Sequence, residues 1–294
     1  MLTLTFLGVG SAFAKRNYQS NALIEAWSQG PEQQGLPDEN LLIDFGATGP
    51  LALYQLKSQP GFEYLDHSGS NHYRAIQRVF ITHLHHDHIG GLEELAIVNR
   101  LSQTNVHAGS IARPMLFGAG EILSDLWECS LRGGLGVFDG RRAALDDYFS
   151  VQPLDPKGTK AEDRIRLLDR YEFIPIRTDH IRISKKFDWP SYGLVIRDSQ
   201  TGQTALYSGD TRFEPETLEP VRAQARLIFH EAQLDDEPQP VHTLLSELRT
   251  LPESTRKKTF LYHFADSWDD PKHLRIAEEF AGFARSGKRY AILP

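Results

Sequence analysis

The residues that could do chemistry begin with the segment "THLHHDHIGG" at positions 82–91. His83, His85, Asp87 and His88 place three imidazoles and a carboxylate within six positions. The preceding "VFIT" is apolar and β-branched, which indicates a buried strand that ends at this cluster. So many costly polar groups at a buried strand end are best explained by a cation that pairs them. One loop that offers two pairs of ligands favours two metal ions over one.

Three more candidate ligands follow predicted strands elsewhere in the chain. His180 ends "FIPIRTDH", Asp210 ends "TALYSGD" and His263 ends "TFLYH". Strand ends that deliver histidine and aspartate predict a convergent site at one edge of a sheet. Imidazole and carboxylate ligands without thiolate suit Zn²⁺, with Mn²⁺ or Fe²⁺ as alternatives. We therefore expect the histidine loop to be half of a binuclear metal site.

Five of the other histidines and the single cysteine are not expected to bind the metals. His86 lies between ligand positions and should point away from the metals. Four other histidines stand in polar or loop contexts and should be solvated or packed: His67, His72, His107 and His273. Cys129 lies in "LSDLWECSLRGG", which has the pattern of an amphipathic helix, and is expected to be a packed core thiol.

The elements that must position these residues alternate between strands and helices, which favours an α/β sandwich. Strands are predicted at 2–9 (half-buried, from its alternation), 20–27, 41–46, 78–83, 170–180, 192–198, 204–210, 226–232 and 258–265. Helices are predicted at 49–58, 90–102, 240–252 and 271–287, and a hairpin turn at 201–203. Residues 102–170 are expected to hold a strand, one or two helices and a long excursion.

Length and composition limit the possible domain organisation, binding partners and location of the protein. The 294 residues are 40% hydrophobic and 24% charged, with a net charge of −7 and a pI of about 5.9. We expect one domain over residues 1–294. The acidic balance disfavours a large polyanionic partner. The apolar start lacks the positive region of a signal peptide, and no apolar run is long enough for a membrane helix, so a cytoplasmic location is expected.

Three motifs resemble the signature of the metallo-β-lactamase fold: "THLHHDHIGG", "SGDT" at 208–211 and "YHF" at 262–264. They recur in the right order over nearly the whole chain, apart from residues 102–170. The resemblance implies an αββα sandwich with the metals at one edge.

Within that group the chain is most similar to ribonuclease Z and related phosphodiesterases. The similarity rests on "LGVGSAFAKRNYQSNALIE" at 7–25, "HIRISKKFDWPSYGLVI" at 180–196 and "FHEAQLDDEPQPVHTLLSEL" at 229–248. The second segment departs from the family pattern at Leu194, which replaces a tyrosine, and the third at Gln233, which replaces a threonine. This branch includes phage anti-Pycsar proteins and other cyclic-nucleotide hydrolases.

The resemblance also implies a role for each site residue. One metal takes His83, His85 and His180. The other takes Asp87, His88 and His263, and Asp210 bridges the two. Metal-bound hydroxide is expected to attack the phosphodiester. Asp87, His242 and Glu231 are the predicted catalytic residues: His242, at the start of a helix, is the candidate general acid that protonates the leaving oxygen, and Glu231 orients it. Asp44 is expected to support the ligand loop. For His230, support of the ligands and simple packing remain open.

The leading substrate is a small phosphodiester such as a cyclic nucleotide. One alternative is a tRNA 3′-processing endonuclease of the ribonuclease Z type, and another is lactone or thioester hydrolysis. A metal-binding protein without activity is disfavoured because all seven ligand positions are filled. The acidic balance disfavours RNA, and so does the segment 102–170, which is expected to be an ordered lid or dimer surface rather than a flexible basic arm. The resemblance implies a homodimer.

Overall fold

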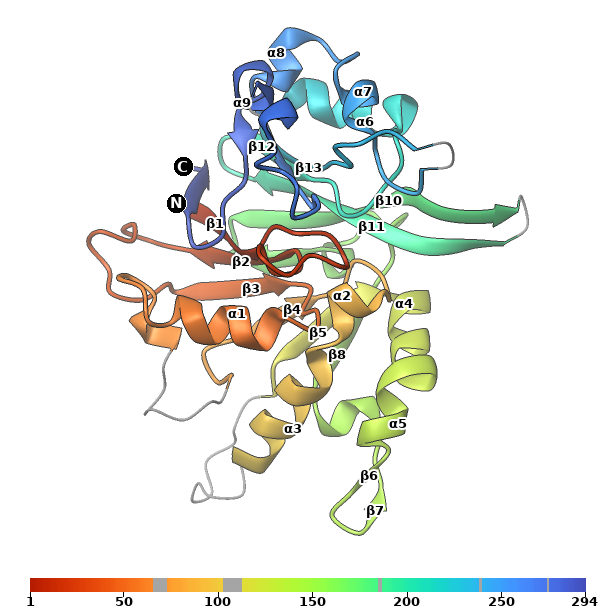
Figure 1. Cartoon of the computed structure of the whole chain (residues 1–294). Helices are drawn as coiled ribbons and strands as arrows, with labels where there is room; N and C mark the ends of the chain where they lie inside the picture. Colours follow the sequence, from red (N-terminus) through yellow and green to blue (C-terminus); the bar gives the residue numbers. More distant parts are fainter. Residues whose placement is uncertain (66–72, 103–112, 185–186, 238–239, 274) are drawn as a thin grey trace.

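Two sheets of seven strands pack face to face, and helices cover the outer face of each sheet (Figure 1). The computed structural model describes residues 1–65, 73–102, 113–184, 187–237, 240–273 and 275–294. The predicted αββα sandwich of the metallo-β-lactamase fold is confirmed. That one domain spans residues 1–294 stays a prediction.

The first sheet carries the histidine loop. Its strands, in order across the sheet, are β16 (Arg289–Leu293), β1 (Leu2–Gly8), β2 (Asn21–Ala26), β3 (Glu39–Ile43), β4 (Arg78–Phe80), β5 (Met115–Ala119) and β8 (Ser150–Leu154). β3, β4, β5 and β8 are parallel, so their carboxyl ends share one edge of the sheet. The cluster at 83–88 follows β4 at that edge.

The second sheet brings the other site residues. Its order is β15 (Gly282–Phe283), β14 (Thr259–Tyr262), β13 (Ala225–Glu231), β12 (Thr204–Tyr207), β11 (Phe187–Asp198), β10 (Tyr171–Ser184) and β9 (Ile165–Leu167). β12, β13 and β14 are parallel. Asp210, Glu231 and His263 stand at or just beyond the carboxyl ends of these three strands, where sites of open parallel sheets form.

The helices divide between the two outer faces (Figure 1). On the first sheet lie α1 (Gly49–Leu56), α2 (His86–Ile89), α3 (Leu92–Ser102), α4 (Gly120–Asp125) and α5 (Arg132–Leu135), with a π-helical turn, Leu126–Leu131, between the last two. On the second lie α6 (Pro215–Gln224), α7 (Leu245–Leu248), α8 (Glu253–Arg256) and α9 (Ile276–Glu279). Short 3-10 helices occupy Glu63–Leu65, Leu145–Asp147, Ala161–Asp163 and Pro271–His273.

The segment 102–170 is not the excursion that we expected from the sequence. β5 and β8 complete the first sheet and β9 joins the second, so much of the segment is integral to the fold. Among the described strands of this segment, those of the small hairpin of β6 (Val137–Phe138) and β7 (Arg141–Arg142) alone pair outside both sheets. β8 pairs in parallel with β5, and the short helices α4 and α5 supply the crossover.

The predicted helices at 49–58 and 90–102 are confirmed, but the two C-terminal ones are wrong. The helix predicted at 240–252 is the single turn α7, so His242 precedes it in a loop rather than opening it. The helix predicted at 271–287 breaks into a 3-10 turn, α9 and β15, because Gly282 has a φ of +125°, which no helix allows. The turn at 201–203 is confirmed between β11 and β12, with Gly202 at a φ of +73°.

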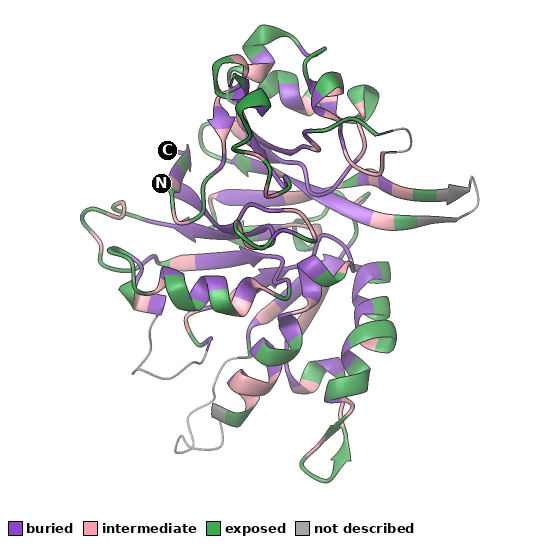
Figure 2. Ribbon diagram, in the orientation of Figure 1, coloured by how far each residue is buried: buried purple, intermediate pink, exposed green. Residues whose placement is uncertain are grey.

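Burial follows the two packed sheets: most of their strands are largely purple in Figure 2, and the outward sides of the helices are green. β1 is buried on both faces rather than half-buried as predicted, because α1 also packs against it. Its Thr3 hydroxyl is satisfied inside the protein by donating to Glu25. None of the helices in the described part of the chain combines the length and the apolar character that crossing a membrane requires.

Candidate metal centre and acid–base pair

Three histidines converge at the edge shared by the two sheets. Nε2 of His83 lies 3.0 Å from Nδ1 of His85, and Nε2 of His180 lies 3.2 Å from the same Nδ1. His83 and His85 follow β4, whereas His180 comes from the middle of β10. The strand predicted to end at His180 continues to Ser184, and a bulge between Asp179 and Ile181 turns His180 toward the cluster.

A second group lies directly beside the first. It contains Asp87, His88, Asp210 and His263, and all four are buried. Oδ2 of Asp210 lies 3.1 Å from Nε2 of His263 and 3.3 Å from Nε2 of His88, and 3.9 Å from Nε2 of His83 in the first group. The Asp210 carboxylate therefore lies between the two groups.

The oxygen and nitrogen atoms of the second group are better placed to bind a metal ion than to form hydrogen bonds with one another. Both oxygens of Asp210 and Nε2 of His88 are buried and have no hydrogen-bond partner among the described residues. Such groups are costly unless a cation pairs them. In each of the two groups the candidate ligand atoms lie within 4.8 Å of one another, which suits them to hold an ion.

The charges of the site also favour a bound metal ion. Burial lowers the pKa of His83, His85 and His180, so these imidazoles are neutral and keep a lone pair for a metal. Burial opposes charge on Asp210 as well, but His263 and His88 hold its pKa well below the usual range. The first group thus combines three neutral imidazoles with the nearby buried Asp210 carboxylate, a ligand set that suits divalent transition metals.

Asp44 organises ligands of both groups from behind. Its Oδ2 accepts a hydrogen bond from Nδ1 of His88 at 2.8 Å and another from the Thr82 hydroxyl at 2.7 Å. The Thr82 oxygen in turn lies 3.0 Å from Nδ1 of His83. These contacts place the Nδ1 protons on the outer side and leave both Nε2 atoms facing the centre. The predicted supporting position of Asp44 agrees with this geometry.

Two site residues hold backbone conformations that are rare for non-glycine residues. Asp44 has a φ of +59° and His263 a φ of +60°. The His263 amide donates to the carbonyl of Val9 at 2.7 Å, which fixes the turn after β14. Gly46 is needed beside Asp44, because a Cβ there would lie 1.7 Å from the carbonyl oxygen of Asp87. Strain of this kind is typical of functional sites.

His242 and Glu231 form a pair at the border of the metal groups. Nδ1 of His242 lies 3.4 Å from Oε2 of Glu231 and 4.0 Å from Oδ2 of Asp210. Oε1 of Glu231 accepts the amides of Thr211 and Thr243, which fixes the buried carboxylate. Burial opposes protonation of His242, but Glu231 and then Asp210 outweigh it and raise the pKa to about 9. The imidazole is therefore protonated at neutral pH.

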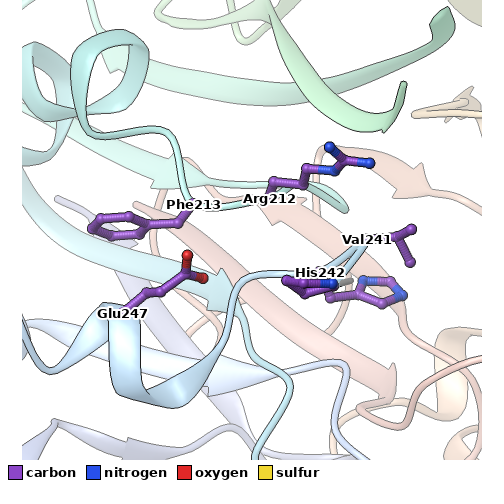
Figure 3. A pocket seen from close by; sticks show the side chains of 6 residues that line it. Arg212, Phe213, Val241, His242 and Glu247 are labelled. Atoms are coloured by element: carbon purple, nitrogen blue, oxygen red, sulfur yellow. The ribbon is translucent and has the colours of Figure 1, made fainter. Parts of the chain in front are cut away.

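Two pockets open on His242. One, of about 470 Å³, is lined by Arg212, Phe213, Pro240, Val241, His242 and Glu247. Figure 3 shows Phe213 and Glu247 on one side of it and Val241 and His242 on the other. The second pocket, of about 400 Å³, is lined by Ser11, Ala12, Phe13, Gln233, Leu234, Asp235, Glu237, Val241, His242, His263 and Ala265. Both volumes suit a small ligand.

Comparison with known proteins places the chain in a family. The family described as "Anti-Pycsar protein Apyc1" matches residues 2–290. The Apyc1 protein of Paenibacillus sp. (strain J14) is 36% identical over 293 residues, which cover 99% of each chain. That of Bacillus phage vB_BsuM-Goe3 is 32% identical and covers 94% of this chain and 95% of its own. The chain belongs to the Apyc1 family.

Solved structures support the fold of this Apyc1-family chain. YhfI from Bacillus subtilis, a metallo-β-lactamase fold protein, superposes with a TM-score of 0.68 at 15% identity over 98% of each chain. Yeast PDE1 gives 0.65 at 17% identity over 98% of each chain, and the short form of human tRNase Z 0.63 at 19% over 99% of this chain and 100% of its own. At these identities the likeness concerns the fold alone. The chain is a metal-dependent hydrolase with the predicted fold and family branch.

The structure of this Apyc1-family chain brings all the predicted site residues to one edge. The groups that it forms match the two predicted ligand sets, and their roles stay predictions. His86 is exposed, as predicted. His230 is buried with Nδ1 donating to the Glu231 carbonyl, so it lies behind the site. His273 is buried, and the predictions for His67, His72 and His107 concern residues outside the described ones.

Three side chains near the site or in the π-helical turn differ from the sequence predictions or were not predicted. Cys129 is exposed rather than packed, because the π-helical turn buries Leu126 and Leu131 five residues apart and turns Cys129 outward. Thr82 was overlooked as a partner of the ligands, although its place directly before His83 was a signal. Trp189 was also overlooked: its ring stacks on that of His85, with centroids 6.5 Å apart.

Proposed function

We propose that the chain is a binuclear metal-dependent phosphodiesterase that hydrolyses a small phosphodiester such as a cyclic nucleotide. The observation that carries the proposal is the shared Asp210 carboxylate between two ligand groups, beside a protonated His242. Membership in the Apyc1 family supports it, since anti-Pycsar proteins were the cyclic-nucleotide hydrolases that the sequence resembled.

We assign one ion to each of the two groups, and Zn²⁺ is our first choice of metal. His83, His85 and His180 would hold one, Asp87, His88 and His263 the other, and Asp210 both. When bound, two such ions supply positive charge to the phosphate oxygens and lower the pKa of water toward about 7. The neutral imidazoles of the first group already offer a lone pair. Burial opposes charge on His88, but Asp210 and Asp87 hold its pKa well above the usual value, so this ring would release a proton when an ion binds.

The protein residues then handle the leaving group. Hydrolysis forms one P–O bond to the water oxygen and breaks the P–O bond to the leaving oxygen, which must gain a proton. Nδ1 of His242 faces Glu231, so Nε2 is the atom that can donate this proton. The Glu231 carboxylate stabilises the imidazolium and holds the ring in place. Arg212 adds a guanidinium to the pocket beside His242, which favours an anionic substrate.

Substrate turnover tests the proposal. The full-length protein, loaded with Zn²⁺ or Mn²⁺, would be incubated with 3′,5′-cyclic nucleotides and, separately, with a pre-tRNA. We expect conversion of the cyclic diesters to monoesters, loss of activity with a chelator and recovery with added metal. Efficient cleavage of pre-tRNA with no turnover of cyclic nucleotides would overturn the substrate class. Hydrolysis of only lactones or thioesters would overturn the phosphodiesterase itself.

We also expect this chain to form a homodimer, as the family resemblance implies, and to act in the cytoplasm. Light scattering of the purified protein would test the dimer. A mass of one chain at micromolar concentration would contradict it.

A further inference from the structure

Phe13 is an aromatic side chain held out into solvent at the rim of the site. It is 88% exposed, the largest exposed fraction among the large hydrophobic side chains that the structure describes. It lies near the tip of a turn in which the Ala14 amide donates to the Ser11 carbonyl at 3.0 Å. Single exposed hydrophobic side chains are common on protein surfaces, so the role of Phe13 is indicated by the pocket that it lines with His242, not by its exposure alone.

The turn that carries Phe13 is firmly anchored. The Asp266 carboxylate accepts the amides of Lys15 at 2.7 Å and Arg16 at 3.0 Å. Both terminal nitrogens of the Arg16 guanidinium donate to the Asp269 carboxylate, at 3.1 and 2.6 Å. These anchors hold Phe13 at a fixed place while leaving its ring free.

The base of the turn is tied to the site itself. The Ser11 amide donates to the carbonyl of Phe264, the residue after His263. Gly10 is required at this base, because a Cβ there would lie 2.4 Å from Cβ of Ala14 and 2.6 Å from the Tyr18 carbonyl oxygen. The position of Phe13 relative to His263 is therefore fixed by backbone contacts.

Phe13 lines the same pocket of about 400 Å³ as His242 and His263. The pocket thus runs from the candidate general acid and a candidate metal ligand to the exposed phenyl ring. A cyclic nucleotide has a phosphodiester at one end and a flat base at the other. When the phosphate of the nucleotide lies at His242, its base can extend into this pocket.

We propose that Phe13 is the platform on which the base of the nucleotide stacks. This inference rests on the proposed function and names the part of the substrate that the second pocket takes. Stacking on an aromatic ring is open to every base, because each has a π face. A ring that is fixed in advance loses little conformational freedom when the base binds. Phe13 is thus a residue for substrate binding rather than for the chemical step.

The test compares a substrate that has a base with one that lacks it. KM and kcat would be measured for a 3′,5′-cyclic nucleotide and for methyl riboside 3′,5′-cyclic phosphate. Phe13→Ala is expected to raise KM for the nucleotide about 5- to 150-fold with kcat nearly unchanged, the range that loss of one stacked base predicts. KM for the baseless diester should not change. Phe13→Tyr should keep the wild-type KM, and Phe13→Leu, apolar but not aromatic, should not.

A matched control is Leu36→Ala, which also shortens an exposed hydrophobic side chain, at 60% exposure, in the loop between β2 and β3. It should leave both substrates unaffected. An unchanged KM in Phe13→Ala, equal losses on both substrates, or a wild-type KM in Phe13→Leu would each overturn the platform. So would a Phe13→Ala variant that loses half its mass in light scattering and keeps its KM, because Phe13 would then serve an interface between copies. Absence of cyclic-nucleotide turnover in the wild type would instead overturn the proposed function, and the platform with it.

Discussion

Asp44 accepts a hydrogen bond from Nδ1 of His88 at 2.8 Å, and both side chains are completely or almost completely buried. The same carboxylate oxygen reaches His83 through the Thr82 hydroxyl. One carboxylate thereby orients an imidazole in each ligand group. Asp44 belongs to neither group of candidate ligands, yet its contacts decide which nitrogen of each ring faces the centre of the site.

Replacing Asp44 should weaken metal binding. Asp44→Asn keeps the shape but can no longer accept both hydrogen bonds as an anion, so we expect about 10- to 100-fold lower metal affinity. Competition with a chelator, followed by elemental analysis, would measure it. Asp139→Asn is the matched control, because Asp139 is exposed and has a similar φ of +52°. Equal affinity in the two variants would show that Asp44 does not orient the ligands.

Asp210 should matter to both ions. Loaded wild-type protein is expected to carry close to two metals per chain, and Asp210→Ala should lose affinity at both positions because its carboxylate lies between the two groups. His180→Ala, which belongs to the first group, should disturb that position and keep the other. Elemental analysis of the three proteins is the measurement. One metal per chain in fully loaded wild type would contradict the binuclear site.

His242 should act on the leaving oxygen. His242→Ala is expected to lower turnover of a cyclic nucleotide about 10²–10⁴-fold with unchanged metal content, the usual range for a general acid. The loss should be smaller for a p-nitrophenyl diester, whose leaving group needs no proton. His86→Ala replaces an exposed histidine of the same loop region and should have no effect. A loss of equal size on both substrates would assign His242 to positioning instead.

The pH dependence should identify the partner of His242. Glu231 and Asp210 raise the pKa of His242 to about 9 against the effect of burial. A general acid works in its protonated form, so activity should be retained below this pKa and fall as pH rises through it. Bound cations favour the neutral ring, so the decisive quantity is the change between proteins. In Glu231→Gln the alkaline limb of kcat should move to lower pH. An alkaline limb that does not move would show that Glu231 does not raise the pKa of His242.

The sequence by itself determined the fold class and indicated the candidate ligands. His83, His85, Asp87 and His88 lie so close together that local chain geometry alone indicates a metal site. His180, Asp210 and His263 could be found because each follows an apolar run. Long helices with a strong pattern, such as α1 and α3, were also predictable, because their periodicity is local.

The tertiary structure decided what depends on distant contacts. The bulge that turns His180 inward exists only in the pairing of β10 with β11. Residues 115–119 and 150–154 became strands of the first sheet because β5 finds its partners β4 and β8 far along the chain. The Asp44–Thr82 network and the anchoring of Phe13 by Asp266 join residues about 40 and 250 positions apart. Such contacts leave no periodic signal in the sequence, since their energies arise only when the chain has folded.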